Sequence, residues 1–260
     1  MDTAGTSTQS EPLPKTEDEA RRIADAARER GITAQALGGI AIFFRCPSAS
    51  LPPLQREYKD IDLVTPRSMT GRLTDMLTEL GHNADKRFNA IHGSQRLFFW
   101  DDLNGRQLDV FVDRFEMCHT FDLRSRLAID ATAPTLPLAD LLLTKMQVVE
   151  MNRKDMMDLA AVLQDHPFTE DESGINIQYI TKLTRNDWGL QHTLEKTIER
   201  LSQEDVVREL AAERPRYIIA DQLQVMAKAL EVAPKSTGWK LRSKVGERKR
   251  WYELPEEARA

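Results

Sequence analysis

The chain has 260 residues, 41% of them hydrophobic, and its 36 basic and 41 acidic side chains give a formal net charge of -5. This composition suffices for a buried core and excludes a uniformly basic coat for nucleic acid, although local patches remain open. Cys46 and Cys118 have no paired spacing, and no leader-like N-terminus or long apolar run occurs, so we expect a cytoplasmic protein without disulfides, zinc or a membrane segment.

The first third of the chain predicts alternating helices and strands. Residues 1–16, rich in Ser, Thr, Pro and Glu, predict a disordered tail, and the run Thr16 to Glu19 has the spacing of a capping box that opens a helix ending at Gly31. The Gly38-Gly39 pair predicts a turn. The further elements that we expect are a strand over 32–37, a short helix over 40–44, a proline-bearing loop over 46–58, a strand over 59–65 and a helix over 68–80.

A β-hairpin is predicted over residues 96–113. Asn104-Gly105 is a preferred two-residue turn between β-rich runs, and the second strand places Asp109, Phe111 and Asp113 on one face. We expect Asp113 to be solvated, which leaves Asp109 as the acidic side chain of interest on this strand.

The second half of the chain predicts helices. Two are expected over 138–152 and 153–163, and helical patterning continues from 171 to about 231. The stretch from Lys235 to Trp251 predicts an irregular or small β-containing tail, which interleaves Trp239 and Trp251 with basic residues. Such a mixture suits RNA contact, and it equally suits an amphipathic cover with buried tryptophans.

The sequence KDIDLV places Asp60 and Asp62 two positions apart on a strand, so both carboxylates point to the same side. Together with Asp109 they provide three hard oxygen donors, the ligand type that Mg²⁺ prefers. Asp60 and Asp62 would hold two ions, and Asp109 would bind the second ion and help to deprotonate an attacking hydroxyl. At Gly38 and Gly39 the backbone could approach a triphosphate closely, because no side chain intervenes.

These motifs resemble the nucleotidyltransferase superfamily, whose signature is a Gly-Gly or Gly-Ser turn, a strand with two alternate aspartates and a third acidic strand. The segments LGGIAIFF, KDIDLVTP and QLDVFVD carry the resemblance. The chain is most similar to the AbiE-type toxin nucleotidyltransferases and the related mycobacterial toxins, through TLPLADLLLTKMQVV and NRKDMMDLAAVL. The gap between Gly39 and Asp60 is longer than is usual in that superfamily.

The resemblance covers about residues 30–165 and implies an α+β fold: a small mixed sheet flanked by helices, followed by a helical C-terminal region. We expect a disordered tail over 1–16, a catalytic domain over 17–135 and a mainly helical region with a basic tail over 136–260. The resemblance also implies that Lys145 contacts nucleotide phosphate and that Asp155 and Asp158 complete the pocket. Lys145 could instead extend along the core, and the two aspartates could form surface ion pairs.

The implied activity is Mg²⁺-dependent transfer of a nucleotidyl group from an NTP to an acceptor hydroxyl. The likeness to toxins suggests tRNA or another RNA as the acceptor and a cognate antitoxin as a partner, while small-molecule and protein hydroxyls remain open. The alternative is a non-catalytic RNA- or protein-binding module that keeps the fold. A metal-dependent phosphohydrolase would need a cluster of His and Asp that the scattered histidines do not supply.

Overall fold

A computed structural model describes residues 10–213 and 215–254 of the chain. Two compact units are present, and the chain passes between them more than once. The sheet unit contains residues 10–41, 57–115 and 122–136, and the helical unit contains residues 42–56, 116–121 and 137–254. The expected fold class is confirmed, because a small mixed sheet is flanked by helices and a helical region follows. The predicted domain boundary at residue 135/136 stays a prediction.

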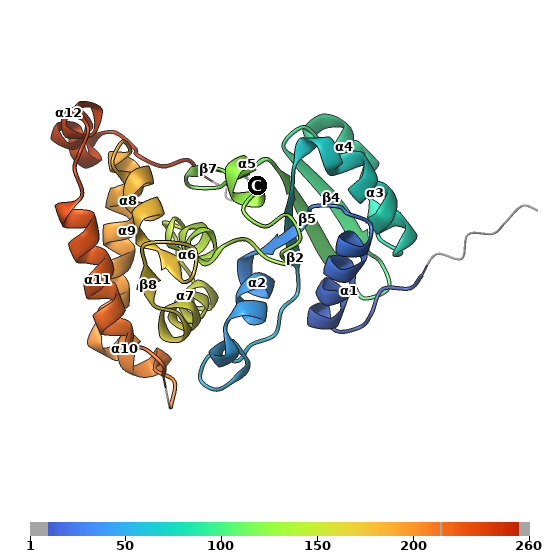
Figure 1. Cartoon of the computed structure of the whole chain (residues 1–260), viewed down its shortest axis with the longest axis horizontal. Coiled ribbons are helices and arrows are strands. Elements are labelled where there is room, and N and C mark those ends of the chain that lie inside the picture. The colour runs from blue at the N-terminus through green and yellow to red at the C-terminus, as the bar shows by residue number, and fades with distance from the viewer. Residues whose placement is uncertain (1–9, 214, 255–260) are drawn as a thin grey trace, which may run out of the picture. The chain divides into compact units, whose positions relative to one another are not determined.

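The sheet unit is built on five strands in the order β1-β2-β5-β4-β3 (Figure 1). The central pair, β2 and β5, is parallel, and each of the other neighbouring pairs is antiparallel. The strand bounds are β1 Gln35–Leu37, β2 Ile61–Thr65, β3 Asn83–Ala84, β4 Arg96–Asp101 and β5 Arg106–Val112. The predicted strands are therefore present, although β1 and β2 begin later than expected.

One face of this sheet belongs to the core of the unit. Leu63, Phe99 and Val110 lie on that face and are at most 2% exposed. Helices α1 (Thr16–Glu29) and α3 (Thr70–Glu79) pack against each other beside the sheet, and their apolar stripes are buried (Figure 1). Because side chains alternate along a strand, the opposite face carries the other half of the residues, including the polar ones discussed below.

The hairpin between β4 and β5 is confirmed, but its predicted two-residue turn is wrong. The last pair in the register is Asp101 with Arg106, so four residues form the loop. The Asp101 carboxylate accepts hydrogen bonds from the backbone and side chain of Asn104. These bonds close a longer turn, in which Gly105 has a φ of +64°.

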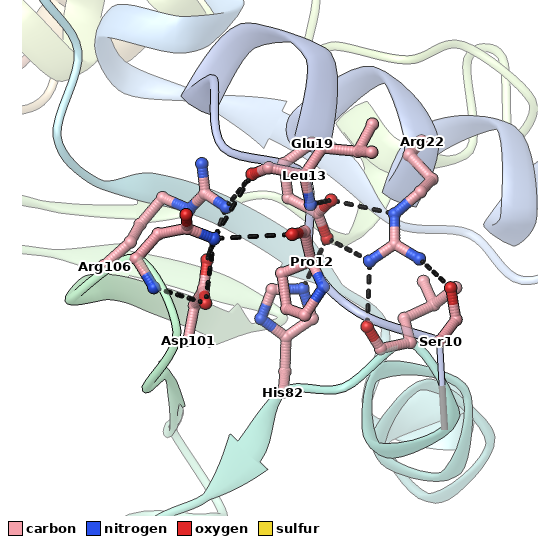
Figure 2. Close-up of polar contacts among 10 residues, drawn as sticks. Ser10, Pro12, Leu13, Glu19, Arg22, His82, Asp101 and Arg106 are labelled. Carbon is pink, nitrogen blue, oxygen red and sulfur yellow. Dashed lines mark hydrogen bonds and ion pairs between the residues drawn. The ribbon is translucent and has the colours of Figure 1, made fainter. Parts of the chain in front are cut away.

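The N-terminal segment before α1 is bound to the sheet unit through buried polar groups (Figure 2). The predicted capping box is wrong: Lys15 is the N-cap residue, and it makes no side-chain capping bond. Glu19 instead accepts hydrogen bonds from the Leu13 backbone at 2.8 Å and from Arg22, and its carboxylate lies 2.7 Å from His82 Nε2. The first nine residues of the predicted tail lie outside the described residues.

Further elements of the sheet unit are α4 (Lys86–His92) and α5 (Arg124–Leu127), with a 3-10 turn, η2, over Arg67–Met69. The helix expected over 40–44 is present as α2 (Gly38–Arg45), but it begins at the first glycine of the pair, and its residues from 42 onward belong to the helical unit. The short strands β6 (Arg114–Glu116) and β7 (Thr120–Asp122) lie where the chain leaves the sheet unit and returns to it.

The helical unit is built around α6 (Leu138–Met146), which is buried along nearly its whole length. The predicted helix over 138–152 therefore ends earlier, and α7 (Arg153–Asp165) begins with a capping box formed by Asn152 and Asp155. The remaining elements are η1 Pro47–Ser50, β8 Phe168–Thr169, β9 Ile175–Asn176, α8 Ile177–Thr184, α9 Trp188–Leu201, α10 Glu204–Leu210, α11 Ile219–Val232, α12 Thr237–Val245 and η3 Gly246–Arg248. The expected β-containing tail is wrong, since α12 is helical.

None of the helices in the described ranges is long and apolar enough to cross a bilayer.

Candidate functional site

Carboxylates from β2 and β5 meet on the face of the sheet that is opposite the core. Asp62 on β2 pairs directly with Asp109 on β5 in the parallel register. Paired residues of neighbouring strands point to the same face, and the strands are about 4.8 Å apart, so the two side chains are adjacent. Asp60 lies immediately before β2, two residues from Asp62, and is exposed. The three predicted aspartates are thus brought to one region of the sheet unit.

Gly38 lies against Asp62. The antiparallel register pairs Leu37 with Asp62, and the chain turns at Gly38 with a φ of +66°. A Cβ atom on residue 38 would lie 2.5 Å from Asp62 Oδ2, which is closer than van der Waals contact allows. Glycine is required here for two reasons, the backbone conformation and the space that the carboxylate fills. Because α2 begins at Gly38, the partial positive charge of its first turn lies beside Asp62.

Asp109 is held by an arginine that the sequence analysis did not single out. Arg96 Nε donates to Asp109 Oδ1 at 2.6 Å, and the two side chains are only 28% and 9% exposed. The guanidinium also lies 5.2 Å from the centre of the Phe111 ring, on the same sheet face. The alternation of residue types in RLFFWD could have identified this residue. Leu97 and Phe99 face the core, so Arg96 lies on the face that carries the carboxylates.

Aromatic side chains continue this face beyond the carboxylates. Phe98 pairs with Asp109 in the register of β4 and β5, and Trp100 lies two residues further along β4. The rings of Phe98 and Trp100 meet edge to face at 5.2 Å, and Phe88 of α4 lies 5.8 Å from Phe98. All three rings are partly exposed. Their position beside Asp109 would allow a planar group, such as a nucleobase, to stack.

The carboxylates have the right chemistry for Mg²⁺, but within the described part of the chain they do not form a group of three metal ligands. Among residues 10–213 and 215–254, no three acidic, histidine or cysteine side chains form a group that could hold a metal ion. The ion pair with Arg96 compensates the negative charge of Asp109. The guanidinium contacts Asp109 Oδ1 directly, where a metal ion would otherwise bind. Asp60 and Asp62 fit a divalent cation as hard, adjacent oxygen donors at the start of β2.

The other predicted site residues lie together in the helical unit. Lys145 of α6 contacts Asp155 Oδ1 and Asp158 Oδ2 of α7, each at 2.9 Å. Arg56 donates to both oxygens of Asp158 at 2.8 and 2.9 Å. Burial alone would lower the pKa of Lys145, yet the charges of Asp158 and Asp155 raise it above the usual value, so the ammonium is retained.

The contacts in this cluster contradict two simpler interpretations of the sequence. Lys145 does not merely extend along the core, and Asp158, at 2% exposure, does not form a surface ion pair. The two groups of predicted residues belong to different units: Gly38, Gly39, Asp60, Asp62 and Asp109 to the sheet unit, and Lys145, Asp155 and Asp158 to the helical unit. Their participation in one nucleotide pocket stays a prediction.

In the basic segment at residues 235–250, some side chains pack against neighbouring residues and others are exposed. Arg242 lies 4.5 Å from the centre of the Trp188 ring and donates to the backbone oxygens of Gly246 and Lys249. Trp251 packs edge to face on Trp188. The side chains of Lys240, Lys244, Arg248, Lys249 and Arg250 are exposed. Arg242 and Trp251 therefore pack as the cover interpretation expects, and RNA contact by the exposed residues stays a prediction.

No known protein family and no curated protein sequence matches this chain. Among solved structures, the chain is similar to ANT(2'')-Ia, in a crystal structure in complex with adenylyl-2''-tobramycin, with 15% identity and a TM-score of 0.36 over 71% of this chain and 97% of that one. A solution structure of the same antibiotic-resistance factor gives 14% identity and a TM-score of 0.36 over 70% and 90%.

A third solved structure, the STING-associated CdnE c-di-GMP synthase from Capnocytophaga granulosa, gives 13% identity and a TM-score of 0.21 over 87% of this chain and 84% of that one. Function is therefore inferred from the site residues themselves.

Proposed function

We propose that this protein is a Mg²⁺-dependent nucleotidyltransferase, which moves an NMP group from an NTP to an acceptor hydroxyl and releases pyrophosphate. The observation that supports this most directly is the row formed by Asp62 and Asp109 on one sheet face, with Gly38 in contact with Asp62. Like charges on neighbouring strands repel each other, and a bound divalent cation would relieve this repulsion.

Each residue has a defined task in this reaction. Asp60 and Asp62 hold the divalent cation, which when bound neutralises charge on the triphosphate. Gly38 and Gly39 let the start of α2 approach the phosphates, where its amide groups favour negative charge. The acceptor oxygen forms a bond to the α-phosphorus as the bond to the leaving pyrophosphate oxygen breaks, and a carboxylate of the row accepts the hydroxyl proton.

Lys145, Asp155 and Asp158 are proposed as further nucleotide-binding residues. A buried lysine whose charge is retained can neutralise a phosphate, and its position is fixed by Asp155 and Asp158. The second aspartate is itself fixed by Arg56. These contacts fix the position of the Lys145 ammonium, because none of the four side chains can reorient without leaving a buried charge unpaired.

The acceptor proposed is RNA, tRNA in particular, with a cognate antitoxin as partner if the protein acts as a toxin of the AbiE type. Support comes from the exposed basic side chains of residues 240–250, which would contact a phosphate backbone, and from the partly exposed rings of Phe98 and Trp100, on which a base could stack.

The test is incubation of the purified chain with Mg²⁺, each of the four α-labelled NTPs and cellular RNA. We expect label in RNA with the wild type and a loss of at least 100-fold with Asp60→Asn or Asp62→Asn. Asp75→Asn is the matched control, because Asp75 is an exposed aspartate of α3 in the same unit. Equal labelling by wild type and Asp62→Asn would refute the proposal.

The non-catalytic alternative is favoured by one observation, the ion pair between Arg96 and Asp109, which already compensates the third carboxylate. Such a module would bind nucleotide or RNA equally well with and without Mg²⁺. Calorimetric titration of the wild type with a nonhydrolysable NTP separates the two functions: binding that strengthens with Mg²⁺ supports the enzyme, and binding that ignores it supports the module.

A further inference from the structure

We propose that the solvent-exposed side of α11 is the interface of a symmetric homodimer, in which α11 of one protomer lies antiparallel to α11 of its partner. The partner assigned to this surface is therefore a second copy of this chain. The inference concerns the helical unit alone and is independent of the proposed activity.

An apolar stripe lies on the exposed side of α11. Ile218, Val225 and Val232 follow one another at intervals of seven residues, and they are 52%, 50% and 64% exposed. Seven residues are close to two helical turns, so Val225 and Val232 lie in one row, and Ile218 continues the spacing at the N-cap. Single exposed apolar side chains are ordinary on a protein surface, but a row of them along one helix is typical of a surface that binds a partner.

The stripe is distinct from the side of α11 that packs within the helical unit. Leu223, Met226 and Leu230 form that buried side. Helix α11 contacts α7, α8 and α9, and Figure 1 shows α8 and α9 beside it. A shallow groove of about 620 Å³ runs along the exposed side, and its lining residues, from Asp221 to Val232, belong to α11. Because helices pack by fitting ridges of side chains into such grooves, a second helix suits this surface.

The charges beside the stripe fit a second copy of α11. Asp221 and Lys228 are exposed and are also seven residues apart, so they lie on the same flank of the stripe. Two-fold symmetry brings equal flanks of two helices together with their directions reversed, so Asp221 of each protomer faces Lys228 of the other. The midpoint between these two positions lies next to Val225, the centre of the apolar stripe. A parallel arrangement would instead place Asp221 against Asp221 and Lys228 against Lys228, and these like charges would oppose it.

The present partner of Lys228 does not prevent this contact. Lys228 Nζ lies 2.8 Å from a carboxylate oxygen of Glu231 in its own chain, and both side chains are exposed. Exposed ion pairs contribute little to stability, because solvent and salt screen them. Lys228 can therefore bind Asp221 of the partner instead.

The experiment measures the oligomeric state of the full chain by sedimentation equilibrium. Helix α11 has 14 residues and is about 21 Å long, so the interface is small. We expect a monomer–dimer equilibrium with a Kd on the order of 10–100 µM, as for a weak interface. Val225→Lys should raise the Kd at least about tenfold, because it places two ammonium groups beside the two-fold axis.

A pair of charge variants tests both the identity of the partner and the direction of the helices. Asp221→Lys leaves two positive charges beside the stripe, and Lys228→Glu leaves two negative charges. Each variant alone should stay monomeric, because both contacts across the axis then join like charges. An equimolar mixture should form a heterodimer with a Kd close to that of the wild type, since both contacts again join opposite charges. The double variant Asp221→Lys/Lys228→Glu should dimerise as the wild type does.

Two substitutions outside α11 serve as controls. Leu51→Lys changes an apolar side chain of the helical unit that is 59% exposed, and Glu199→Lys reverses an exposed acidic charge on α9. Both should keep the Kd of the wild type. Thermal melting by circular dichroism verifies that each variant is folded.

A wild type that stays monomeric over a concentration range that brackets the expected Kd would overturn the inference. A dimer whose Kd is unchanged in Val225→Lys would also overturn it, since another surface would then hold the protomers together. If the mixed charge variants do not associate, the antiparallel pairing is wrong. None of these results alters the labelling of RNA that tests the proposed function, so the two proposals fail separately.

Discussion

The side chain of Asp62 fills the space beside Gly38 that a Cβ atom would occupy, with Oδ2 2.5 Å from that position. This contact joins two motifs that are more than twenty residues apart in the sequence, the glycine turn and the strand with two alternate aspartates. The proline-bearing segment between them does not separate them in space, because β1 and β2 are antiparallel neighbours. The long gap noted in the sequence therefore leaves the glycine turn in place.

Gly38→Ala should destabilise the protein by about 2–4 kcal/mol, from backbone strain at positive φ and from the collision with Asp62. It should also displace the carboxylate and abolish Mn²⁺ binding. The matched control is Gly31→Ala, where φ is +58° and a Cβ would meet nothing within 4 Å, so only the strain of about 1 kcal/mol applies. Urea unfolding and Mn²⁺ titration measure both effects. Equal losses of stability in the two variants would contradict the contact.

Removal of Lys145 should be strongly destabilising. Lys145→Met leaves Asp155 and Asp158 without their shared cation, and Arg56 compensates only the second of them. We expect a loss of about 3–5 kcal/mol in urea unfolding. Asp155→Asn in the Lys145→Met background should recover part of it, which a double-mutant cycle reports as coupling.

The control for this cycle is Lys196→Met. Lys196 forms an exposed pair with Glu199 at 3.6 Å, so its removal should change stability by less than about 0.5 kcal/mol. A similar small effect at Lys145 would show that the buried cluster does not form.

The buried carboxylate of Glu19 should give a characteristic acid dependence of stability. Burial alone would raise its pKa, but hydrogen bonds from His82, Arg22 and the Leu13 backbone lower it from 4.5 to about 2. A lowered pKa contributes stability above the unfolded value of 4.5 that is lost as pH falls toward 2. Relative to Glu19→Gln, the wild type should be more stable by about 3 kcal/mol at pH 6, and this difference should shrink below pH 4.5.

Asp18→Asn is the control for this pH series, because Asp18 is exposed on the same helix. Its stability should follow that of the wild type between pH 6 and pH 3 in denaturant titrations. If the free energies of unfolding of the wild type and of Glu19→Gln fall in parallel with pH, the Glu19 carboxylate is not ionised in the folded protein at low pH.

Asn89 should protect the strand segment beside Asp109. Its side chain accepts from Phe98 N at 2.7 Å and donates to Phe98 O at 3.1 Å, which gives this backbone amide its hydrogen-bond partner. Asn89→Ala leaves this backbone amide without its partner, at a cost of about 1–3 kcal/mol. Amide hydrogen exchange at Phe98 should therefore accelerate at least about tenfold. In Asn83→Ala, which removes an exposed contact with Asp102, it should not change.

Local sequence signals predicted most of the elements that carry the candidate site. Glycine at residue 38, the alternation around Asp60 and Asp62, and the β-rich runs before and after Asn104 each act over a few residues, so the turn, β2 and the hairpin could be recognised. The capping box at Thr16 and the two-residue turn were wrong, each because a carboxylate makes hydrogen bonds that the local pattern does not reveal. The Glu19 carboxylate is bound by the distant His82 instead of capping α1, and the Asp101 carboxylate binds Asn104 and Arg106, which closes a longer loop.

The sequence by itself determined which residue types are available: three aspartates on strands, a glycine pair, and a lysine followed by two aspartates on helices. Only the tertiary structure decided which charges meet. The strand register places Asp62 opposite Asp109 and Arg96 diagonal to it, and helix packing places Lys145 between Asp155 and Asp158. Periodicity fixes the face on which a side chain lies, but the pairing of strands and helices depends on contacts between residues far apart in the chain, which no local pattern contains.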